Sequence, residues 1–277
     1  MTIDDIIKKS LEEDLGDGDH TSLSTIPKNA MGKARLIAKE NGVIAGIRIA
    51  KMVYLSVDKD TKFKALIEDG DMLKTGDVIF EVSGKSISIL SAERLALNFM
   101  QRMSGVATMT KKYVDAIQGT STTLLDTRKT TPLMRELEKE AVKLGGGDNH
   151  RMGLFDMIMI KDNHIDFAGG ITPAIKACHD YLNANNKSLK IEIEVRNFDE
   201  LDEVLKFGKI DRIMLDNFSP KELIKALGLI NGTYETEASG GINIDTIRDY
   251  AETGVDFISV GALTHHIKSL DLSLKAF

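Results

Sequence analysis

The stretch IEIEVRNFDELDEVLKFGKIDRIMLD, residues 191–216, contains a strand pattern, a helix pattern and a second strand pattern in succession. Its two ends, IEIEV and RIMLD, are short and rich in β-branched or apolar residues, whereas FDELDEVLKF places apolar residues at helical spacing. A strand, a helix and a strand in this order form a parallel pair with the helix against one face of the sheet. This βαβ unit therefore indicates an α/β fold.

The same alternation extends on both sides of this unit, from residue 120 almost to the end of the chain. We expect further strands at TLLD (123–126), MIMI (157–160), YETEAS (234–239) and FISVG (257–261), with helical patterns between them. Repeated βα units imply parallel strands with helices outside, either as a barrel or as an open doubly wound sheet. No G-x-G-x-x-G motif follows any strand, which disfavours a dinucleotide-binding sheet. We therefore favour a barrel with six strands.

The pattern before residue 120 is different. Short strand-like runs at 33–46, 62–70 and 78–84 are separated by the turn signals EDGD and KTGD. A long helical pattern follows, and Ser91 is its expected N-cap. Pro132, Pro173 and Pro220 each follow Thr or Ser, which predicts three further helix starts with the proline at the first helical position.

The bulk composition excludes several classes of protein. The 277 residues are 42% hydrophobic and 28% charged with a net charge of −6, and an acidic balance is atypical of a nucleic-acid-binding surface. The single cysteine, Cys178, cannot form an internal disulfide or a cysteine-based zinc site. No segment has the apolar length of a membrane span, and the N-terminal MTIDDIIKKSLEEDLG is unlike a signal peptide. We expect a cytoplasmic protein with no nucleic-acid or membrane partner.

Chemically distinctive side chains follow the expected strands at the end where α/β barrels carry their functional residues. Positive side chains surround the early strand ends, acids follow the middle strands, and small residues follow the last two. They are Arg128, Lys129, His150, Arg151 and Lys161, then Glu194 and Asp216, then Ser239, Gly240, Gly241 and Gly261. Because the carboxyl ends of parallel strands meet at one end of a barrel, we expect one pocket that holds an anionic small molecule.

Two features of this pocket suggest a phosphorylated partner and a metal ion. The glycine-containing segments SGGIN (239–243) and VGALT (260–264) are suited to binding phosphate through main-chain N–H groups at the start of a helix. Glu194 and Asp216 supply carboxylate oxygens, which Mg²⁺ prefers together with phosphate oxygens and water. We therefore expect the organic anion on one side of the pocket and a metal-bound phosphorylated molecule on the other.

Each of these segments also has a purely structural interpretation. A Lys or Arg after a strand is commonly a solvated loop residue, and glycines 145–147 fit the end of a helix. Glu192 and Glu194 lie on one face of their strand and fit the wet face of an edge strand. The SGG segment fits a turn before a helix that begins near Asn243. Their shared position at one end of the barrel favours a site.

At these positions the chain resembles the quinolinate phosphoribosyltransferase family, also called the carboxylating nicotinate-nucleotide pyrophosphorylases. The resemblance covers nearly the whole chain, and its most specific motifs are SAERLALNFMQRMSGVAT (91–108), DTRKTTPLMRELEKEAVKLGGGDNHRMGL (126–154), MIKDNHI (159–165), LDNF (215–218), SGGIN and ETGVDFISVGALTHH (252–266). It implies an N-terminal α/β sandwich domain at 1–107 and a six-stranded α/β barrel (TIM-like) at 108–264. It further implies that the C-terminal segment 265–277 packs back on the first domain.

The implied reaction joins quinolinate to 5-phosphoribosyl 1-pyrophosphate with Mg²⁺. It gives nicotinate mononucleotide, pyrophosphate and carbon dioxide in NAD biosynthesis. Carried over residue by residue, the quinolinate site falls on Arg128, Lys129, His150, Arg151 and Lys161, the ribose and metal site on Glu194 and Asp216, and the phosphate loops on Ser239, Gly240, Gly241, Gly261 and His265. The catalytic group is expected to be Lys129, Lys161, Glu194 and Asp216.

The resemblance also implies a homodimer with a shared active site, and a hexamer stays open. Arg94, in the motif AER, resembles the arginine that reaches from one subunit into the neighbouring site. Neither the dimer nor this crossing contact follows from the spacing of residues along the chain.

Three rival functions stay open. A paralogous family linked to molybdate-transport operons shares the fold but is expected to lose part of the quinolinate cluster, whereas this chain retains all of it. A Schiff-base aldolase would use Lys161 as nucleophile and would need a depressed lysine pKa, which the neighbouring arginines are placed to cause. A phosphosugar-binding barrel without turnover would bind phosphoribosyl pyrophosphate but release no pyrophosphate.

Overall fold

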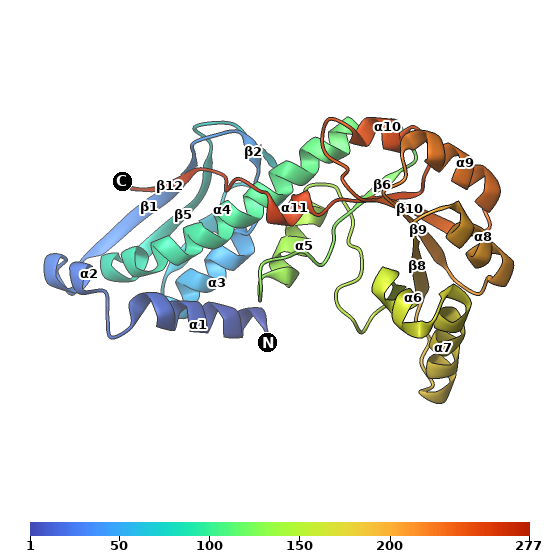
Figure 1. Ribbon diagram of the computed structural model, residues 1–277. Coiled ribbons are helices and arrows are strands. Elements are labelled where there is room, and N and C mark those ends of the chain that lie inside the picture. Colours follow the sequence, from blue (N-terminus) through green and yellow to red (C-terminus); the bar gives the residue numbers. More distant parts are fainter. The chain divides into compact units, whose positions relative to one another are not determined.

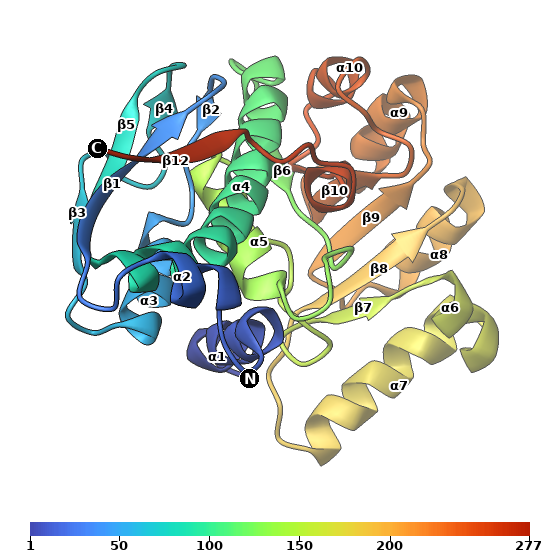
Figure 2. The same ribbon diagram turned by 90° about the vertical axis from the view of Figure 1, so that its left-hand side faces the viewer.

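The computed structural model describes residues 1–277, and the chain divides into two compact units (Figures 1 and 2). The first unit comprises Met1–Lys111, Thr131–Gly146 and His266–Phe277, and the second comprises Lys112–Thr130 and Gly147–His265. The sequence places the boundary between residues 107 and 108 and assigns 131–146 to the barrel, whereas the contacts group 131–146 with the first unit. No helix of the chain has the length and apolar character that crossing a membrane requires.

The first unit is built on a four-stranded antiparallel sheet in the order β12-β1-β5-β3. Its last strand comes from the C-terminal segment, since β12 pairs with β1. The strands are β1 (Met31–Ala38), β3 (Lys62–Ala65), β5 (Val78–Lys85) and β12 (Leu272–Ala276), with a small pair β2 (Gly42–Val43) and β4 (Met72–Leu73). The helices are α1 (Ile3–Leu15), α2 (His20–Thr25), α3 (Ile47–Val57), α4 (Ser86–Ala116) and α5 (Arg135–Leu144).

Aromatic packing joins α3 to this sheet. Tyr54 of α3 is buried, and its ring centroid lies 6.0 Å from that of Phe63 in β3 and 5.9 Å from that of Phe80 in β5. The two phenylalanine rings are 4.4 Å apart. Large buried rings of this kind contribute strongly to a core because each removes a large apolar area from water.

The long helix α4 begins earlier than the sequence predicts. It starts at Ser86, so the prediction of Ser91 as N-cap is wrong. The segment from Ile87 to Leu90 alternates like a strand, but Ile89 is buried one turn before Ala92, as helical spacing requires. The hydroxyl of Ser91 donates instead to Asp19 at 3.0 Å.

The second unit is a six-stranded parallel sheet in the order β6-β11-β10-β9-β8-β7, with helices in its crossovers (Figure 2). This confirms the α/β class and the six predicted strands. The strands are β6 (Thr123–Leu125), β7 (Ile158–Ile160), β8 (Ile191–Val195), β9 (Arg212–Asp216), β10 (Glu235–Ser239) and β11 (Phe257–Ser259). The helices are α6 (Asp162–Ala168), α7 (Ile171–Ala184), α8 (Phe198–Phe207), α9 (Pro220–Ile230), α10 (Ile247–Ala251) and α11 (Ala262–His265).

Only one of the three proline-marked helix starts is placed as the sequence predicts. Ser219 caps α9 in a capping box, and Pro220 is its first residue. The other two predictions are wrong: α7 begins at Ile171 after Gly170, before Pro173, and α5 begins at Arg135, beyond Pro132. Leu133, which follows Pro132, has a φ of 66° and so interrupts any helix there.

The middle strands of the parallel sheet are buried on both faces. All five residues of β8 are buried, because β8 lies between β7 and β9 and does not form an edge. The interpretation of Glu192 and Glu194 as the wet face of an edge strand is therefore wrong. Both carboxylates lie inside the second unit. A buried carboxylate is destabilising unless a hydrogen-bond or ion-pair partner offsets its charge.

Two helix-interior glycines predict opposite effects of the same substitution on stability. A Cβ at Gly105 in α4 would lie 2.4 Å from the main-chain oxygen of Lys268, so Gly105→Ala should lower the free energy of unfolding by about 1–3 kcal/mol. Gly228 in α9 has no atom within 4 Å of such a Cβ, so Gly228→Ala should raise it by about 0.5–1 kcal/mol. Urea unfolding of both variants measures the difference, and two substitutions that change stability equally would contradict this packing.

Candidate active site

A cavity of about 600 Å³ opens where the strands of the parallel sheet end. Its wall contains every residue of the second unit that the sequence singles out as a site residue: Arg128, Lys129, His150, Arg151, Lys161, Glu194, Asp216, Ser239, Gly240, Gly241, Gly261 and His265. The wall also contains Thr127, Met159, Met214, Glu237, Ile242, Ser259, Val260 and Ala262. The parallel strands thus bring residues from seven separate segments into one cavity.

Two arginines contribute positive charge to the cavity wall. The guanidinium of Arg151 donates to the main-chain oxygen of Met157 at 3.1 Å and is half-buried. Burial lowers the pKa of Arg151, and the positive charge of Arg128 lowers it further. The Nε atom of Arg128 is buried and has no hydrogen-bond acceptor. A donor of this kind, buried beside a second cation, fits an anionic ligand that supplies the acceptor.

The two lysines of this wall have different neighbours. Lys161 follows β7, and its Nζ forms an ion pair with Glu194 at 2.8 Å. Lys129 follows β6, and its aliphatic Cδ would lie 3.0 Å from a Cβ placed on Gly261. The same Cβ would lie 2.8 Å from Nε2 of His265. Any larger residue at 261 would displace the side chains of Lys129 and His265, which is consistent with a glycine after β11.

The acidic part of the wall consists of Glu194 and Asp216. Burial raises the pKa of Asp216, and the negative charge of Glu194 raises it further, while Lys161 and Asn217 partly offset both effects. A carboxylate whose proton affinity is raised by a neighbouring carboxylate in this way fits a divalent cation, since a cation relieves the same repulsion. Their oxygens are also the ligand type that Mg²⁺ prefers.

The glycine segment after β10 forms a tight turn against the end of β9. Gly240 and Gly241 have φ values of 96° and 64°, in the left-handed region that favours glycine. A Cβ on Gly240 would lie 2.3 Å from Oδ1 of Asn217 and 2.8 Å from its main-chain nitrogen. The next helix, α10, starts at Ile247 and has five residues, so the prediction of a helix near Asn243 is wrong. The phosphate prediction therefore rests on the glycine turn and receives no support from a helix dipole.

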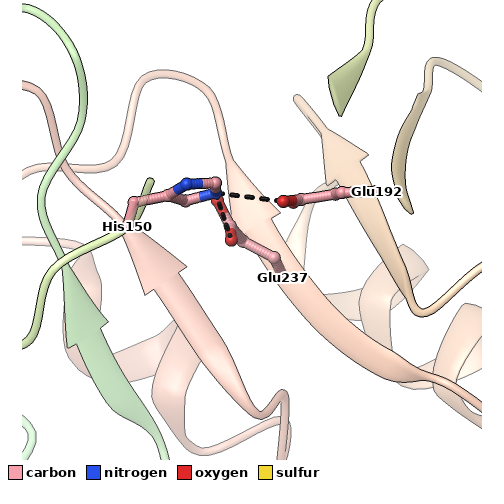
Figure 3. Close-up of side chains that lie close together, drawn as sticks. All are labelled: His150, Glu192 and Glu237. Carbon is pink, nitrogen blue, oxygen red and sulfur yellow. Dashed lines mark ion pairs between the residues drawn. The ribbon is translucent and has the colours of Figure 1, made fainter. Parts of the chain in front are cut away.

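A buried cluster of charged side chains underlies this wall (Figure 3). The Nε2 atom of His150 lies 3.1 Å from a carboxylate oxygen of Glu192 and 3.2 Å from one of Glu237. Both glutamates are fully buried, and the histidine side chain is 4% exposed. The same oxygen of Glu237, Oε2, accepts from Nη1 of Arg212 at 3.1 Å. These side chains come from the central strands β8, β9 and β10 and from the segment before β7.

The protons of this cluster can be placed from its geometry. Burial lowers the pKa of His150, but the bonds from Glu192 and Glu237 outweigh burial and raise the pKa to about 9. The main-chain N–H of Arg151 donates to Nδ1 of the ring at 2.7 Å and needs its lone pair, which opposes a doubly protonated ring. The proton that faces the two glutamates therefore lies on Nε2, and burial together with the charge of Glu237 raises the pKa of Glu192.

Sequence patterns alone do not assign Glu237 and Arg212 to the site, and they leave Glu192 on a solvated face. The available signal is charge in a central strand: IEIEV and ETEAS each carry acids at alternate positions. An acid that faces the interior of a parallel sheet needs a partner. His150 and Arg212 are those partners, and both are distant from the glutamates in sequence.

Arg94 lies outside the second unit, in α4 of the first unit, and its side chain is exposed. Its predicted role in the active site of a neighbouring subunit stays a prediction.

Two family models match the chain. Residues 19–104 match the N-terminal domain of quinolinate phosphoribosyl transferase, and residues 106–275 match its C-terminal domain. A quinolinate phosphoribosyltransferase [decarboxylating] of Nicotiana tabacum is 46% identical over 285 residues, which cover 98% of this chain and 81% of that protein. A probable nicotinate-nucleotide pyrophosphorylase [carboxylating] of Bacillus subtilis is 42% identical over 95% of this chain and 89% of its own length.

Solved structures agree with these sequence matches. The crystal structure of NadC from Streptococcus pyogenes superimposes with a TM-score of 0.94 at 40% identity, and covers 99% of this chain and 95% of that chain. A human nicotinic acid phosphoribosyltransferase superimposes with a TM-score of 0.65 at 12% identity, which indicates a shared fold.

Proposed function

Since the chain belongs to the quinolinate phosphoribosyltransferase family, we propose that its cavity joins quinolinate to 5-phosphoribosyl 1-pyrophosphate. The products are nicotinate mononucleotide, pyrophosphate and carbon dioxide, and the reaction belongs to the de novo synthesis of NAD. One observation carries the proposal for this cavity. Four positive side chains line it together with three carboxylates, and one of the cations has a buried donor with no acceptor.

The positive part of the wall suits quinolinate, which is a dianion. Arg128 and Arg151 provide planar groups that match a carboxylate in two hydrogen bonds, and Lys129 and Lys161 provide compact charges. Each charge-assisted hydrogen bond in a closed pocket contributes about 1.5–3 kcal/mol. The dianion would also relieve the repulsion between Arg128 and Arg151 that lowers the pKa of Arg151.

The acidic part of the wall suits the ribose and a magnesium ion. Glu194 and Asp216 would hold Mg²⁺, and the negative charge of Glu194, which raises the pKa of Asp216, supports this assignment. When bound, Mg²⁺ supplies positive charge that neutralises the pyrophosphate leaving group. Glu194 also stabilises positive charge on the ribose carbon as the bond to pyrophosphate lengthens. Ser239, Gly240, Gly241, Gly261 and His265 lie beside this part of the wall and are assigned to the phosphates.

The chemistry needs positioning more than a nucleophilic side chain. The ring nitrogen of quinolinate bonds to the ribose carbon while the bond from that carbon to pyrophosphate breaks. Orientation of the two reactants can contribute ~7–11 kcal/mol in favourable cases. The alkylated ring is positively charged, so it accepts the electron pair released when the adjacent carboxylate leaves as carbon dioxide. The ring carbon then takes up a proton, and no covalent intermediate with the protein is needed.

The geometry of Lys161 disfavours the aldolase alternative. A Schiff-base nucleophile must be a neutral amine. The Nζ atom of Lys161 instead forms an ion pair with Glu194 at 2.8 Å, and attack on a carbonyl carbon would first have to break this pair. This arrangement suits a lysine that binds a substrate carboxylate.

The oligomeric part of the proposal concerns Arg94. Its exposed position on α4 leaves its guanidinium available to a second copy of the chain. We assign it to the quinolinate site of a neighbouring subunit in a homodimer, as the family resemblance implies. A cytoplasmic location stays a prediction.

The activity itself is tested by product analysis. Purified protein given quinolinate, phosphoribosyl pyrophosphate and Mg²⁺ should release nicotinate mononucleotide and carbon dioxide in equal amounts, and chelation of the metal should abolish both. Binding of phosphoribosyl pyrophosphate with no release of pyrophosphate when quinolinate is added would support the phosphosugar-binding alternative and overturn the proposal.

Arg128 gives a substrate-specific prediction. Arg128→Ala removes a guanidinium whose Nε is buried without an acceptor, so the Kd for quinolinate should rise about 10- to 100-fold while that for phosphoribosyl pyrophosphate changes little. Arg196→Ala is the matched control, because Arg196 also follows a strand but is exposed and does not line the cavity. Calorimetry measures both constants. Equal quinolinate affinity in the two variants would remove Arg128 from the site.

The shared site predicts complementation between two inactive variants. Arg94→Ala and Lys161→Ala should each be inactive alone, because each damages every site of a homodimer. A mixed dimer has one site built from both unaltered residues and one site that lacks both. Mixing the denatured variants and refolding them should therefore restore up to about a quarter of the wild-type rate, by random pairing. No recovery from verified mixed dimers would contradict the crossing arginine.

A further inference from the structure

A continuous chain of polar contacts leads from the core of the second unit to Arg151. Arg212 of β9 donates from Nη1 to Glu237 of β10 at 3.1 Å, and its other nitrogens bond Glu235. Arg212 also lies over the ring of Phe257, 3.9 Å from its centroid. The guanidinium is thereby held on three sides, and it fixes the carboxylate of Glu237 in turn.

Glu237 and Glu192 hold the His150 ring by one edge. Its Nε2 atom lies 3.1 Å from an oxygen of Glu192 and 3.2 Å from one of Glu237, so this nitrogen points into the core. The other ring nitrogen, Nδ1, accepts from the main-chain N–H of Arg151 at 2.7 Å. One ring nitrogen therefore accepts a main-chain hydrogen bond and the other lies at ion-pair distance from two glutamates, although the ring lines the cavity. This arrangement suits a residue that orients its neighbour better than one that binds substrate through a ring nitrogen.

The main chain beside this ring is held from a third direction. The N–H of His150 donates to Oδ1 of Asp126, which is fully buried at the end of β6. Arg151 is consequently fixed at both ends, by the ring of His150 at its main chain and by the oxygen of Met157 at its guanidinium. Its guanidinium is therefore held in place before a ligand binds, so less side-chain conformational entropy is lost on binding.

We propose that Glu237, braced by Arg212, is a positioning residue for quinolinate: it holds the His150 ring, and the ring holds the main chain from which Arg151 reaches the cavity. The inference rests on the proposed function, because it names how one quinolinate-binding arginine is placed. Glu237 itself belongs to no motif that assigns it a role.

Two other interpretations of the cluster fit less well. A histidine and two glutamates whose ligand atoms lie within 4.8 Å have the composition of a metal site. The guanidinium of Arg212, however, donates to the oxygen of Glu237 that faces His150, so a metal ion bound between these residues would lie close to a fixed positive charge. A purely structural role is served better by apolar residues of the same volume, since burying a charged network gives little net stability.

The test separates positioning from folding by comparing two glutamates of one strand. Glu237→Gln keeps the volume but weakens the hold on His150, so KM and Kd for quinolinate should rise roughly 10- to 100-fold while KM for phosphoribosyl pyrophosphate changes less than about twofold. Glu235→Gln is the matched control, because Glu235 also bonds Arg212 but is not in contact with the His150 ring in the cluster. Its quinolinate constants should stay within about twofold of wild type.

A second comparison tests the route through Arg151. If Glu237 acts by placing that arginine, Glu237→Gln should raise the KM for quinolinate less in an Arg151→Lys background than in the wild-type protein. Such non-additivity is expected of two residues that act through the same contact. Should Glu237→Gln fail to fold, Arg212→Lys loosens the same brace while keeping the charge, and should raise the quinolinate KM in the same selective way.

Three outcomes would overturn the inference. They are unchanged quinolinate constants in folded Glu237→Gln, an equal loss in Glu235→Gln, and an equal rise in KM for both substrates. Stoichiometric metal that is lost from Glu237→Gln alone would also overturn it in favour of a metal site. Wild-type protein that binds no quinolinate would instead contradict the proposed function, and the inference would fall with it.

Discussion

The cavity depends on concentrating positive charge in a chain that is acidic as a whole. Arg128 and Arg151 are close enough for one to lower the pKa of the other, and burial lowers it further. Gathering cations out of water is unfavourable unless a partner supplies negative charge. Lys161 has such a partner in Glu194, whereas the buried Nε of Arg128 has none. The site is thus electrostatically incomplete, and a compact dianion completes it.

The parallel sheet stabilises this group of cations by placing buried acidic side chains in a layer below them. Glu192 and Glu237 lie within the sheet, where His150 and Arg212 offset their charge. The substrate-facing cations lie one layer further toward the ends of the strands. Because β8, β9 and β10 are adjacent and in register, acids at alternate positions of two strands meet one histidine from outside the sheet. The core therefore holds the site in shape as well as excluding water.

Much of this could be predicted from the sequence, for identifiable reasons. Strand positions and the parallel class follow from short apolar runs alternating with helical patterns, and the strand ends then place Arg128, Lys161, Glu194 and Asp216 in one cavity. The starts of two helices are predicted less well. Residues Ile87 to Leu90 alternate like a strand and hide the start of α4. Leu133 has a left-handed φ, which no local sequence motif indicates. The buried network of charged side chains cannot be predicted from the sequence, because a glutamate in a strand fits a solvent-facing position unless its distant partners, His150 and Arg212, are known. Its pairings depend on strand order, which periodicity does not encode.

The most direct measurement is a crystal structure of this protein with quinolinate bound. We expect one carboxylate within hydrogen-bond distance of Nε of Arg128 and the other at Arg151 or Lys161, with the His150 ring still turned toward Glu237. A dicarboxylate found outside the cavity, or bound inside it with Arg128 and Arg151 turned away into solvent, would contradict the electrostatic basis of the site.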